Sequence, residues 1–194
     1  MQRFKFVLGL SFFFLISCSH LQDNDKCLLQ NASEEMWPNG VPKKMKLLTL
    51  QDSLFYYIEL DSLGRLTSVK TFWGSKEDGV QVYFHREGRN VGAIKNMVQN
   101  RGEGAVYEFY PDLSIAFLGH LKNDSFMGEA KSYYENGILE SVGDVIDSRE
   151  DGLWHYYYPS GQLKAKGTYV RGVRQDDWEC WDEYGGQVDC QEVF

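Results

Sequence analysis

The chain has 194 residues, a formal net charge of −8, 15% aromatic residues, 19 glycines and four prolines. This length allows one domain with a modest core, and the acidic balance argues against a basic surface for nucleic acid. A hydrophobic content of 43% excludes disorder over the whole length, and aromatic residues combined with many glycines favour strands joined by turns.

The first 17 residues are predicted to be a signal peptide. Arg3 and Lys5 precede an uncharged apolar stretch, residues 6–16, which is too short to span a bilayer as a helix. It ends in Leu15-Ile16-Ser17-Cys18, which resembles the lipobox of bacterial lipoproteins. The resemblance implies that Cys18 carries a lipid anchor and becomes the mature N-terminus, so that the protein is held at a membrane of the bacterial cell envelope. The alternative is an ordinary secretory signal that contains a cysteine by chance.

Residues 18–34 are rich in Ser, Asn and Asp and are predicted to be a flexible tether. Residues 35–194 are organised by a 24-residue repeat. Glycines in turn-like contexts recur at this interval in two sets, which are separated by two periods plus one residue, and Leu113 stands where the missing glycine would fall. The predicted turn glycines are Gly40, Gly64, Gly88, Gly137, Gly161 and Gly185.

One repeat shows the expected local structure. Residues 153–158 are a strand candidate, residues 159–161 form a turn, and residues 162–169 form a second strand. A small residue recurs in the middle of the second strand, at Gly119, Gly143 and Gly167, which predicts that an aromatic ring packs over the bare backbone. Because an isolated hairpin is marginally stable in water, about seven hairpins are predicted to stack into an all-β, elongated, open antiparallel β-meander.

These residues carry a family likeness. Residues 152–164, Gly-Leu-Trp-His-Tyr-Tyr-Tyr-Pro-Ser-Gly-Gln-Leu-Lys, are similar to the MORN repeat variant, and residues 133–140 match its Tyr-Tyr-Glu-Asn-Gly core. The chain resembles the YwqK family, whose members are strings of this variant and are often labelled as antitoxins. The resemblance is clear over 128–188 and partial over 52–127, and it implies a hairpin array that binds proteins or membrane surfaces. The sequence departs from the pattern at Leu113 and at Asp176, which makes the local turns doubtful.

Aromatic residues of neighbouring repeats suggest an interaction face. Alternation places three rings of one strand on one side, with two more in neighbouring repeats. Such rings are enriched at binding hot spots, but the alternative is that they only cover the sheet. A second column, Tyr133, Tyr157 and Trp181, lies on the opposite face, so the sequence does not say which face is free. The candidate face consists of Tyr134, Trp154, Tyr156, Tyr158 and Trp178.

The cysteines and histidines give no sign of a metal or catalytic site. Cys180 and Cys190 flank a turn-like stretch and could form a disulfide across a hairpin or remain free thiols, and Cys27 would then be unpaired. The four histidines share neither a repeat column nor a ligand spacing, and no nucleophile or phosphate-binding motif is found. We therefore expect no cofactor, no metal and no catalytic residues.

The expected function is that of a non-enzymatic, membrane-tethered protein-interaction module of the cell envelope. Two alternatives remain open at this stage. One is an antitoxin or immunity protein of the YwqK type that neutralises a cognate toxin, and the other is an envelope glycan-binding or hydrolytic protein.

Overall fold

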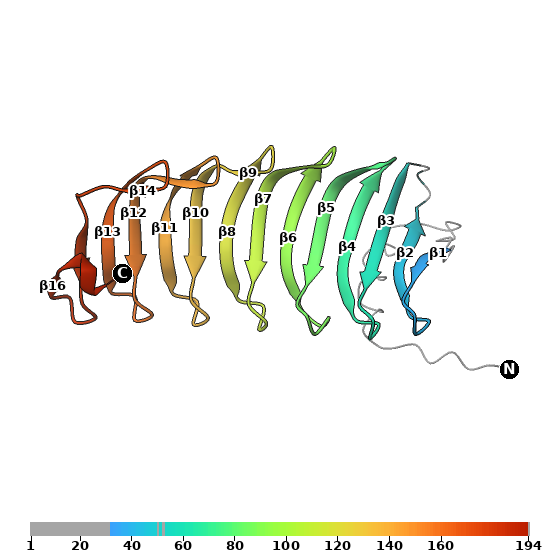
Figure 1. Ribbon diagram of the computed structural model, residues 1–194, viewed down its shortest axis with the longest axis horizontal. Helices are drawn as coiled ribbons and strands as arrows, with labels where there is room; N and C mark the ends of the chain where they lie inside the picture. Colours follow the sequence, from blue (N-terminus) through green and yellow to red (C-terminus); the bar gives the residue numbers. More distant parts are fainter. Residues whose placement is uncertain (1–31, 50, 52, 194) are drawn as a thin grey trace, which may run out of the picture.

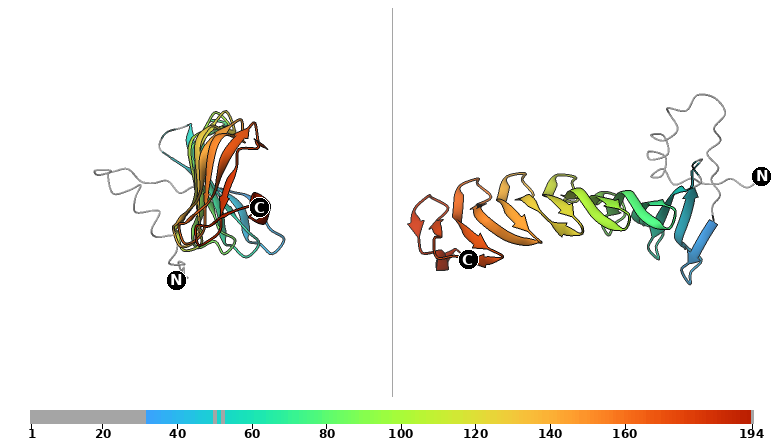
Figure 2. Two further views of the ribbon diagram at one scale, coloured as in Figure 1. Left: turned by 90° about the vertical axis from the view of Figure 1, so that its left-hand side faces the viewer. Right: turned by 90° about the horizontal axis from the view of Figure 1, so that it is seen from above.

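The repeats form one continuous antiparallel sheet. The computed structural model describes residues 32–49, 51 and 53–193; Cys18, Cys27 and the predicted signal peptide lie outside the described residues. Hairpin follows hairpin in sequence order along the elongated molecule (Figure 1), and the described elements form a single twisted layer (Figure 2). The predicted open meander of seven hairpins is therefore confirmed.

The strands have these bounds: β1 Ala32–Met36, β2 Pro42–Leu48, β3 Leu54–Leu60, β4 Leu66–Trp73, β5 Lys76–Phe84, β6 Val91–Val98, β7 Arg101–Phe109, β8 Ile115–Lys122, β9 Ser125–Phe126, β10 Gly128–Tyr133, β11 Leu139–Ile146, β12 Arg149–Tyr157, β13 Leu163–Val170, β14 Val173–Arg174, β15 Glu179–Trp181 and β16 Gln187–Val188; a short 3-10 helix, η1, covers Cys190–Glu192. β1 begins three residues before residue 35, the predicted start of the repeat domain. None of the described residues belongs to a helix with the length and hydropathy needed to cross a membrane.

Each hairpin closes in the same tight turn. In the hairpin of β10 and β11, the Tyr134 N–H donates to the Ile138 carbonyl at 2.9 Å and the Gly137 N–H donates to the Tyr134 carbonyl at 2.8 Å. The other described hairpins repeat this pair of bonds. In the hairpin of β5 and β6 the His85 N–H reaches the Asn90 carbonyl, five residues on instead of four. That turn therefore holds the extra residue seen in the spacing of the glycines.

Residues with positive φ angles lie in the turns at both ends of the strands. The six predicted turn glycines have φ between +65° and +86°, and Leu113 takes the same conformation at +73°. At the other end of the strands, successive hairpins are joined by two-residue connections. One of them is Asp147-Ser148, whose φ angles of +51° and +61° give the twist that suits a tight turn between antiparallel strands. Leu113 thus leaves the course of its turn unchanged. At Asp176, the second departure from the pattern, the strand is interrupted, and β14 and β15 pair separately with β13.

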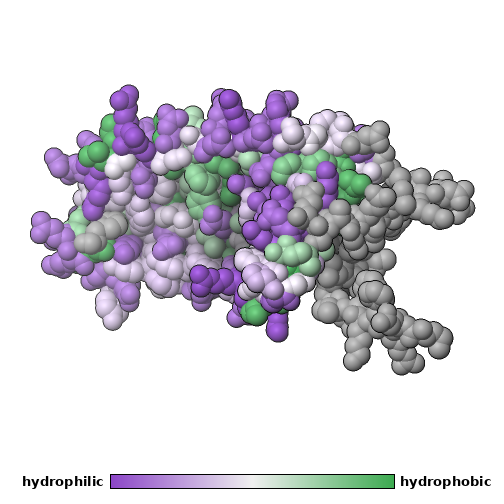
Figure 3. Space-filling model, turned by 45° about the vertical axis from the view of Figure 1, so that its right-hand side comes forward, coloured by the Kyte–Doolittle hydropathy of each residue, from purple (hydrophilic) through white to green (hydrophobic). Residues whose placement is uncertain are grey.

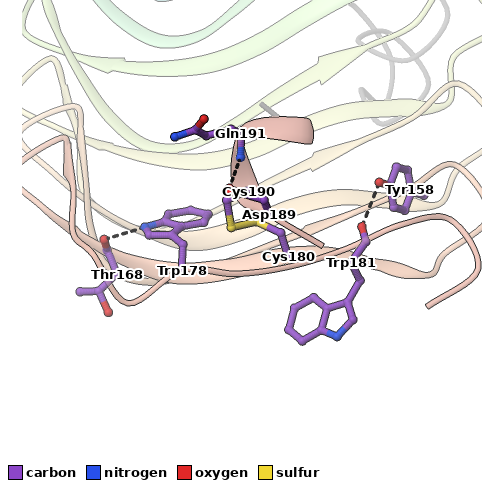
Figure 4. The surroundings of a disulfide bond; sticks show 8 residues. All are labelled: Tyr158, Thr168, Trp178, Cys180, Trp181, Asp189, Cys190 and Gln191. Atoms are coloured by element: carbon purple, nitrogen blue, oxygen red, sulfur yellow. Dashed lines mark hydrogen bonds between the residues drawn. A yellow bond between two sulfur atoms is a disulfide. The ribbon is translucent and has the colours of Figure 1, made fainter. Parts of the chain in front are cut away.

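Tyrosine hydroxyls join neighbouring hairpins. Tyr110, Tyr134 and Tyr158 hold the first position of three successive turns, and each donates to a backbone carbonyl 23 residues further along the chain, at 2.6, 2.7 and 3.0 Å. Figure 4 shows the last of these bonds, to the Trp181 carbonyl. His85 holds the same position in an earlier turn, and its buried Nε2 has no hydrogen-bond partner. The ladder of hydroxyls is therefore incomplete at this histidine.

Aromatic rings cover the glycines in the middle of the second strands, as the sequence predicts. A Cβ atom at Gly143 would overlap the ring of Trp154, and one at Gly167 would overlap the ring of Trp178. At Gly119 a Cβ would lie 2.8 Å from the ring of Phe117. Each glycine thus lets a large ring lie flat on the sheet, which is how a single layer buries apolar area without a second layer.

A disulfide closes the C-terminal end of the sheet. Cys180 in β15 and Cys190 in η1 are joined with an S–S distance of 2.04 Å (Figure 4). The Asp189 side chain caps η1 by accepting from the Gln191 N–H at 3.0 Å. Of the two options that the sequence left open, the structure has the bridge. Because β16 has two residues and is followed by a helical turn, this edge offers little for another strand to pair with.

Candidate interaction faces

The register assigns each strand residue to one of two faces. Residues that pair directly across neighbouring strands lie on the same side of a sheet, and successive residues of a strand alternate. We call the side that carries Trp154 and its partner Gly167 the Trp154 face, and the side that carries Tyr157 and its partner Leu163 the Tyr157 face. The pairs continue from hairpin to hairpin, so that each face consists of rows of side chains that run across the strands.

The two faces differ in burial. Among the described residues, almost every buried side chain lies on the Trp154 face, and Ile58 is the exception. This face therefore holds the core of the sheet. Its buried side chains are Phe55, Ser68, Gln81, Met97, Val106, Ala130, Ser141, Val145, Trp154, Ala165 and Cys180.

The strand rings of the predicted aromatic face belong to this core. Trp154 is 7% exposed and forms a cluster with Ala130 and Val145. Tyr156 and Trp178 pack against the cluster, with their ring centroids 5.8 Å apart, and the Trp154 Nε1–H donates to a backbone carbonyl of β11 at 3.0 Å. These contacts favour the alternative in which the rings cover the sheet, because little ring surface is left for a partner.

The other two predicted residues act between repeats. The hydroxyls of Tyr134 and Tyr158 are used in the ladder described above, and the Lys164 ammonium lies 5.6 Å from the centre of the Tyr158 ring. Within the core, burial and a hydrogen bond with Tyr169 raise the pKa of Tyr156. Tyr156 is therefore uncharged at neutral pH, as expected for a side chain that serves packing.

Large exposed apolar side chains gather on the Tyr157 face instead. Val80 is 51% and Leu153 is 55% exposed, although each lies in the middle of its strand. Among the described strands, Leu48 is the one such residue on the Trp154 face. Figure 3 shows hydrophobic side chains in patches between polar ones on the side that it displays. The exposed set on the Tyr157 face is Met36, Trp73, Val80, Val98, Tyr107, Ile115, Ile146, Leu153, Val170 and Val173.

The central row of the Tyr157 face changes from apolar to partly charged residues along the sheet. From β10 onward it contains Lys131, His155 and Lys166, whereas from β2 to β8 it is wholly apolar. The Trp154 face carries rings along its whole length, but in the N-terminal hairpins rings such as Phe55 and Tyr57 lie among charged residues. The apolar part of the central row consists of Met45, Ile58, Val69, Val82, Ile94, Tyr107 and Leu118.

The charged residues on the N-terminal part of the Trp154 face include a connected group around Glu59. Its carboxylate accepts from the Ser68 hydroxyl at 2.6 Å and pairs with the Lys70 ammonium at 3.3 Å. Burial alone would raise the pKa of Glu59, but the Ser68 hydrogen bond and the charges of Lys70 and Lys44 outweigh it and hold this pKa below its usual value. Glu59 is therefore ionised at neutral pH and is fixed in place by its neighbours.

Metal-ligating side chains are scattered over the part of the sheet that the structure describes. No three of the described His, Cys, Asp or Glu side chains lie close enough together to bind a metal ion. A hollow of about 350 Å³ opens on the Trp154 face, and Glu150 is the one carboxylate in a lining of otherwise uncharged side chains such as Phe117, Ser132 and Trp154. Its walls are the core rings described above, so the hollow is a consequence of packing.

Comparison with known proteins supports the repeat type. Residues 128–145 and 150–171 match the family model of the MORN repeat variant. The matched residues cover the hairpins of β10–β11 and β12–β13. No curated protein matches the chain's sequence at a significant level. Among solved structures, a crystal structure of a point mutant of S. aureus TarM in complex with Fondaparinux, alpha-GlcNAc-glycerol and UDP aligns with a TM-score of 0.37 and 9% identity, and a crystal structure of TarM aligns with 0.36 and 10%. Each alignment covers 57% of this chain and 21% of the other.

The exposed apolar face was missed in the sequence, although a signal for it exists. Trp73, Val98, Ile146 and Val170 are each the eighth residue of a second strand, in β4, β6, β11 and β13. They recur at about the 24-residue period of the turn glycines, with one extra residue between Trp73 and Val98. An apolar residue repeated at the solvent-exposed end of a strand has no packing role in its own hairpin, and this column could have been recognised.

Proposed function

We propose that the protein is a non-enzymatic, lipid-anchored interaction module of the bacterial cell envelope that docks a partner protein on its Tyr157 face. The observation that carries the proposal is the separation of the two faces. The core rings are buried on the Trp154 face, and all but one of the exposed apolar strand residues that the structure describes lie on the other. Contiguous exposed apolar surface on a protein is a mark of interaction sites.

The binding surface would include the apolar row between β2 and β8, in which Tyr107 is exposed, Ile58 is buried and the other side chains are half-buried. The row contains seven apolar side chains in succession across the strands, without a charged residue among them. Neighbouring strands lie about 4.8 Å apart, so the row is about 30 Å long. A partner that covers it would gain the free energy of burying aliphatic and aromatic side chains, which dominate interface cores.

The absence of catalysis is part of the proposal. Three carboxylates serve the fold: Asp61 and Asp182 accept from backbone N–H groups of their own turns, and Asp177 accepts from Thr168. A carboxylate held in this way stabilises a turn or a strand.

The envelope location is proposed from two features. The lipobox-like sequence that ends at Cys18 would supply the anchor, and the Cys180–Cys190 disulfide suits an oxidising compartment. Fractionation of cells tests the anchor: the protein should partition with membranes, and Cys18→Ala should release it. Membrane association that is unchanged in Cys18→Ala would contradict lipidation at this residue.

Charge substitutions on the Tyr157 face test the docking surface. Val80→Glu and Leu153→Glu each place a carboxylate on an exposed apolar position, so we expect loss of a defined crosslinked complex in intact cells with an unchanged melting temperature. Leu63→Glu is the matched control, because Leu63 is 72% exposed but lies in a turn outside the face. A crosslinked complex that survives both face substitutions, or one lost equally in the control, would refute docking on this face.

A further inference from the structure

In the N-terminal hairpins, lysines take the strand position that glycines hold in the later hairpins. In β8, β11 and β13 the fifth residue is the glycine that lies under a ring. In the second strands of the three preceding hairpins, β2, β4 and β6, the fifth residue is Lys46, Lys70 and Lys95. The same row of the Trp154 face thus changes from bare backbone to a line of ammonium groups.

The register places these three lysines in a single row. Lys46 and Lys70 both pair with Tyr57, and Lys70 and Lys95 both pair with Gln81. The lysines therefore occupy alternate strands. Because neighbouring strands lie about 4.8 Å apart, successive lysines are about 10 Å apart along the sheet.

Two of the three ammonium groups contact rings without a carboxylate to neutralise them. The Lys46 Nζ lies 3.9 Å from the centre of the Phe55 ring, and the Lys95 Nζ lies 5.3 Å from the centre of the Tyr83 ring. Over the part of the chain that the structure describes, neither forms an ion pair, whereas Lys70 pairs with Glu59. Cation–π contacts orient an ammonium group but leave its charge available to an anion.

Carboxylates flank the lysine row on both sides, and one further lysine, Lys44, lies opposite Glu59 in the neighbouring row. Glu59 and Glu108 lie in the next row toward the turn glycines, and Glu77 lies in the next row toward the other edge. A broad anionic surface such as a membrane would press its charges against these carboxylates, and the chain's net charge of −8 would oppose it further. A single narrow chain with widely spaced acids can contact the lysines and avoid the carboxylates.

We propose that Lys46, Lys70 and Lys95 bind an extended acidic segment of a partner protein that runs across the strands. An extended polypeptide advances about 3.3 Å per residue, so carboxylates at every third residue repeat at about 10 Å and match the lysines. The proposal adds a second surface and a partner chemistry to the interaction role proposed above, on which it rests. The two proposals can be told apart, because binding to the lysine row is tested with a peptide in solution and docking on the Tyr157 face is tested by crosslinking in cells.

The test is fluorescence anisotropy with the purified protein and a labelled Ser/Gly peptide that carries glutamate at every third residue. We expect salt-sensitive binding that weakens about tenfold in the double variant Lys46→Gln/Lys95→Gln, which is within the range for two partly exposed ion pairs. Lys70→Gln should weaken binding less, because Glu59 already holds that ammonium group.

Matched controls separate this row from general attraction between charges. Lys76→Gln/Lys122→Gln removes the same charge from the Tyr157 face and should change the affinity less than about twofold. A peptide of equal charge with glutamate at every second residue should bind more weakly. Equal losses in the two double variants, equal binding of the two peptides, or tighter binding to anionic phosphatidylglycerol vesicles than to the peptide would each overturn the proposal.

Discussion

Gly143→Ala tests whether rings on bare backbone hold the sheet together. Gly143 lies within β11 and is not among the residues with positive φ, so alanine meets no backbone strain there. Its Cβ would overlap the Trp154 ring, which is 7% exposed and bonded through Nε1. Overpacking a dense core costs about 1–3 kcal/mol, and the lost hydrogen bond adds about 1 kcal/mol. We expect a loss of about 2–4 kcal/mol, which lowers the melting temperature by about 4–16 °C in a chain of this size.

Urea unfolding followed by circular dichroism measures this loss, and a second background isolates its cause. Val106 holds the place of Trp154 in the hairpin of β7 and β8, so Trp154→Val is a substitution that the repeat accommodates. In that background Gly143→Ala should cost less than about 0.5 kcal/mol, because the ring is gone. An equal cost in both backgrounds, or none in the wild type, would refute the idea that the glycine exists to admit the ring.

Four further changes should each shift stability in a stated direction. His85→Tyr should raise the melting temperature by an amount equivalent to about 1 kcal/mol, because a hydroxyl would complete the ladder at a position whose nitrogen has no partner. Leu113→Gly should stabilise by about 1 kcal/mol in urea unfolding, since the leucine has φ of +73°; no gain would show that the turn is unstrained. Glu59→Gln should flatten the stability–pH profile: the lowered pKa gives the wild type stability that is present above about pH 4.5 and is lost as the pH falls through the folded-state value. Reduction of Cys180–Cys190, ten residues apart, should cost about 3 kcal/mol by loop entropy, and hydrogen exchange should show faster exchange in β15 and β16 while β3 to β6 are unchanged.

The features that were predictable from the sequence are local and periodic. The turn glycines could be placed because a left-handed residue is needed once in every hairpin, and Gly137 and Gly161 mark that position directly. The ring over the mid-strand glycine could be inferred for the same reason. A backbone without a side chain beside a strand rich in aromatics, as in Gly167 beside Trp178, implies close contact.

The assignment of faces could not be predicted as reliably, because it depends on register between strands. Alternation put Trp154 and Tyr156 on one side correctly, but it did not say whether that side is covered. The deciding fact is that Gly143 and Gly167 share the face of Trp154, and this follows from pairs across strands. A β-bulge near the turn shifts the register in every hairpin from β1–β2 to β12–β13, as between Tyr156 and Tyr157, so that counting along a strand fails there.

A single-layered sheet has no second layer to cover its apolar side chains, and its two ends meet this difficulty differently. A meander without a second layer can bury apolar area only by laying side chains over its own backbone, and this requires small residues beneath large ones. The C-terminal hairpins meet the requirement on the Trp154 face, where glycine lies under tryptophan. The N-terminal hairpins have lysines in that column and place a row of aliphatic side chains on the Tyr157 face, of which Ile58 is buried and Val69, Val82 and Ile94 are half-buried. The two halves of the sheet therefore bury apolar area in different ways, whereas both expose apolar side chains on the Tyr157 face, such as Val80 in β5 and Leu153 in β12.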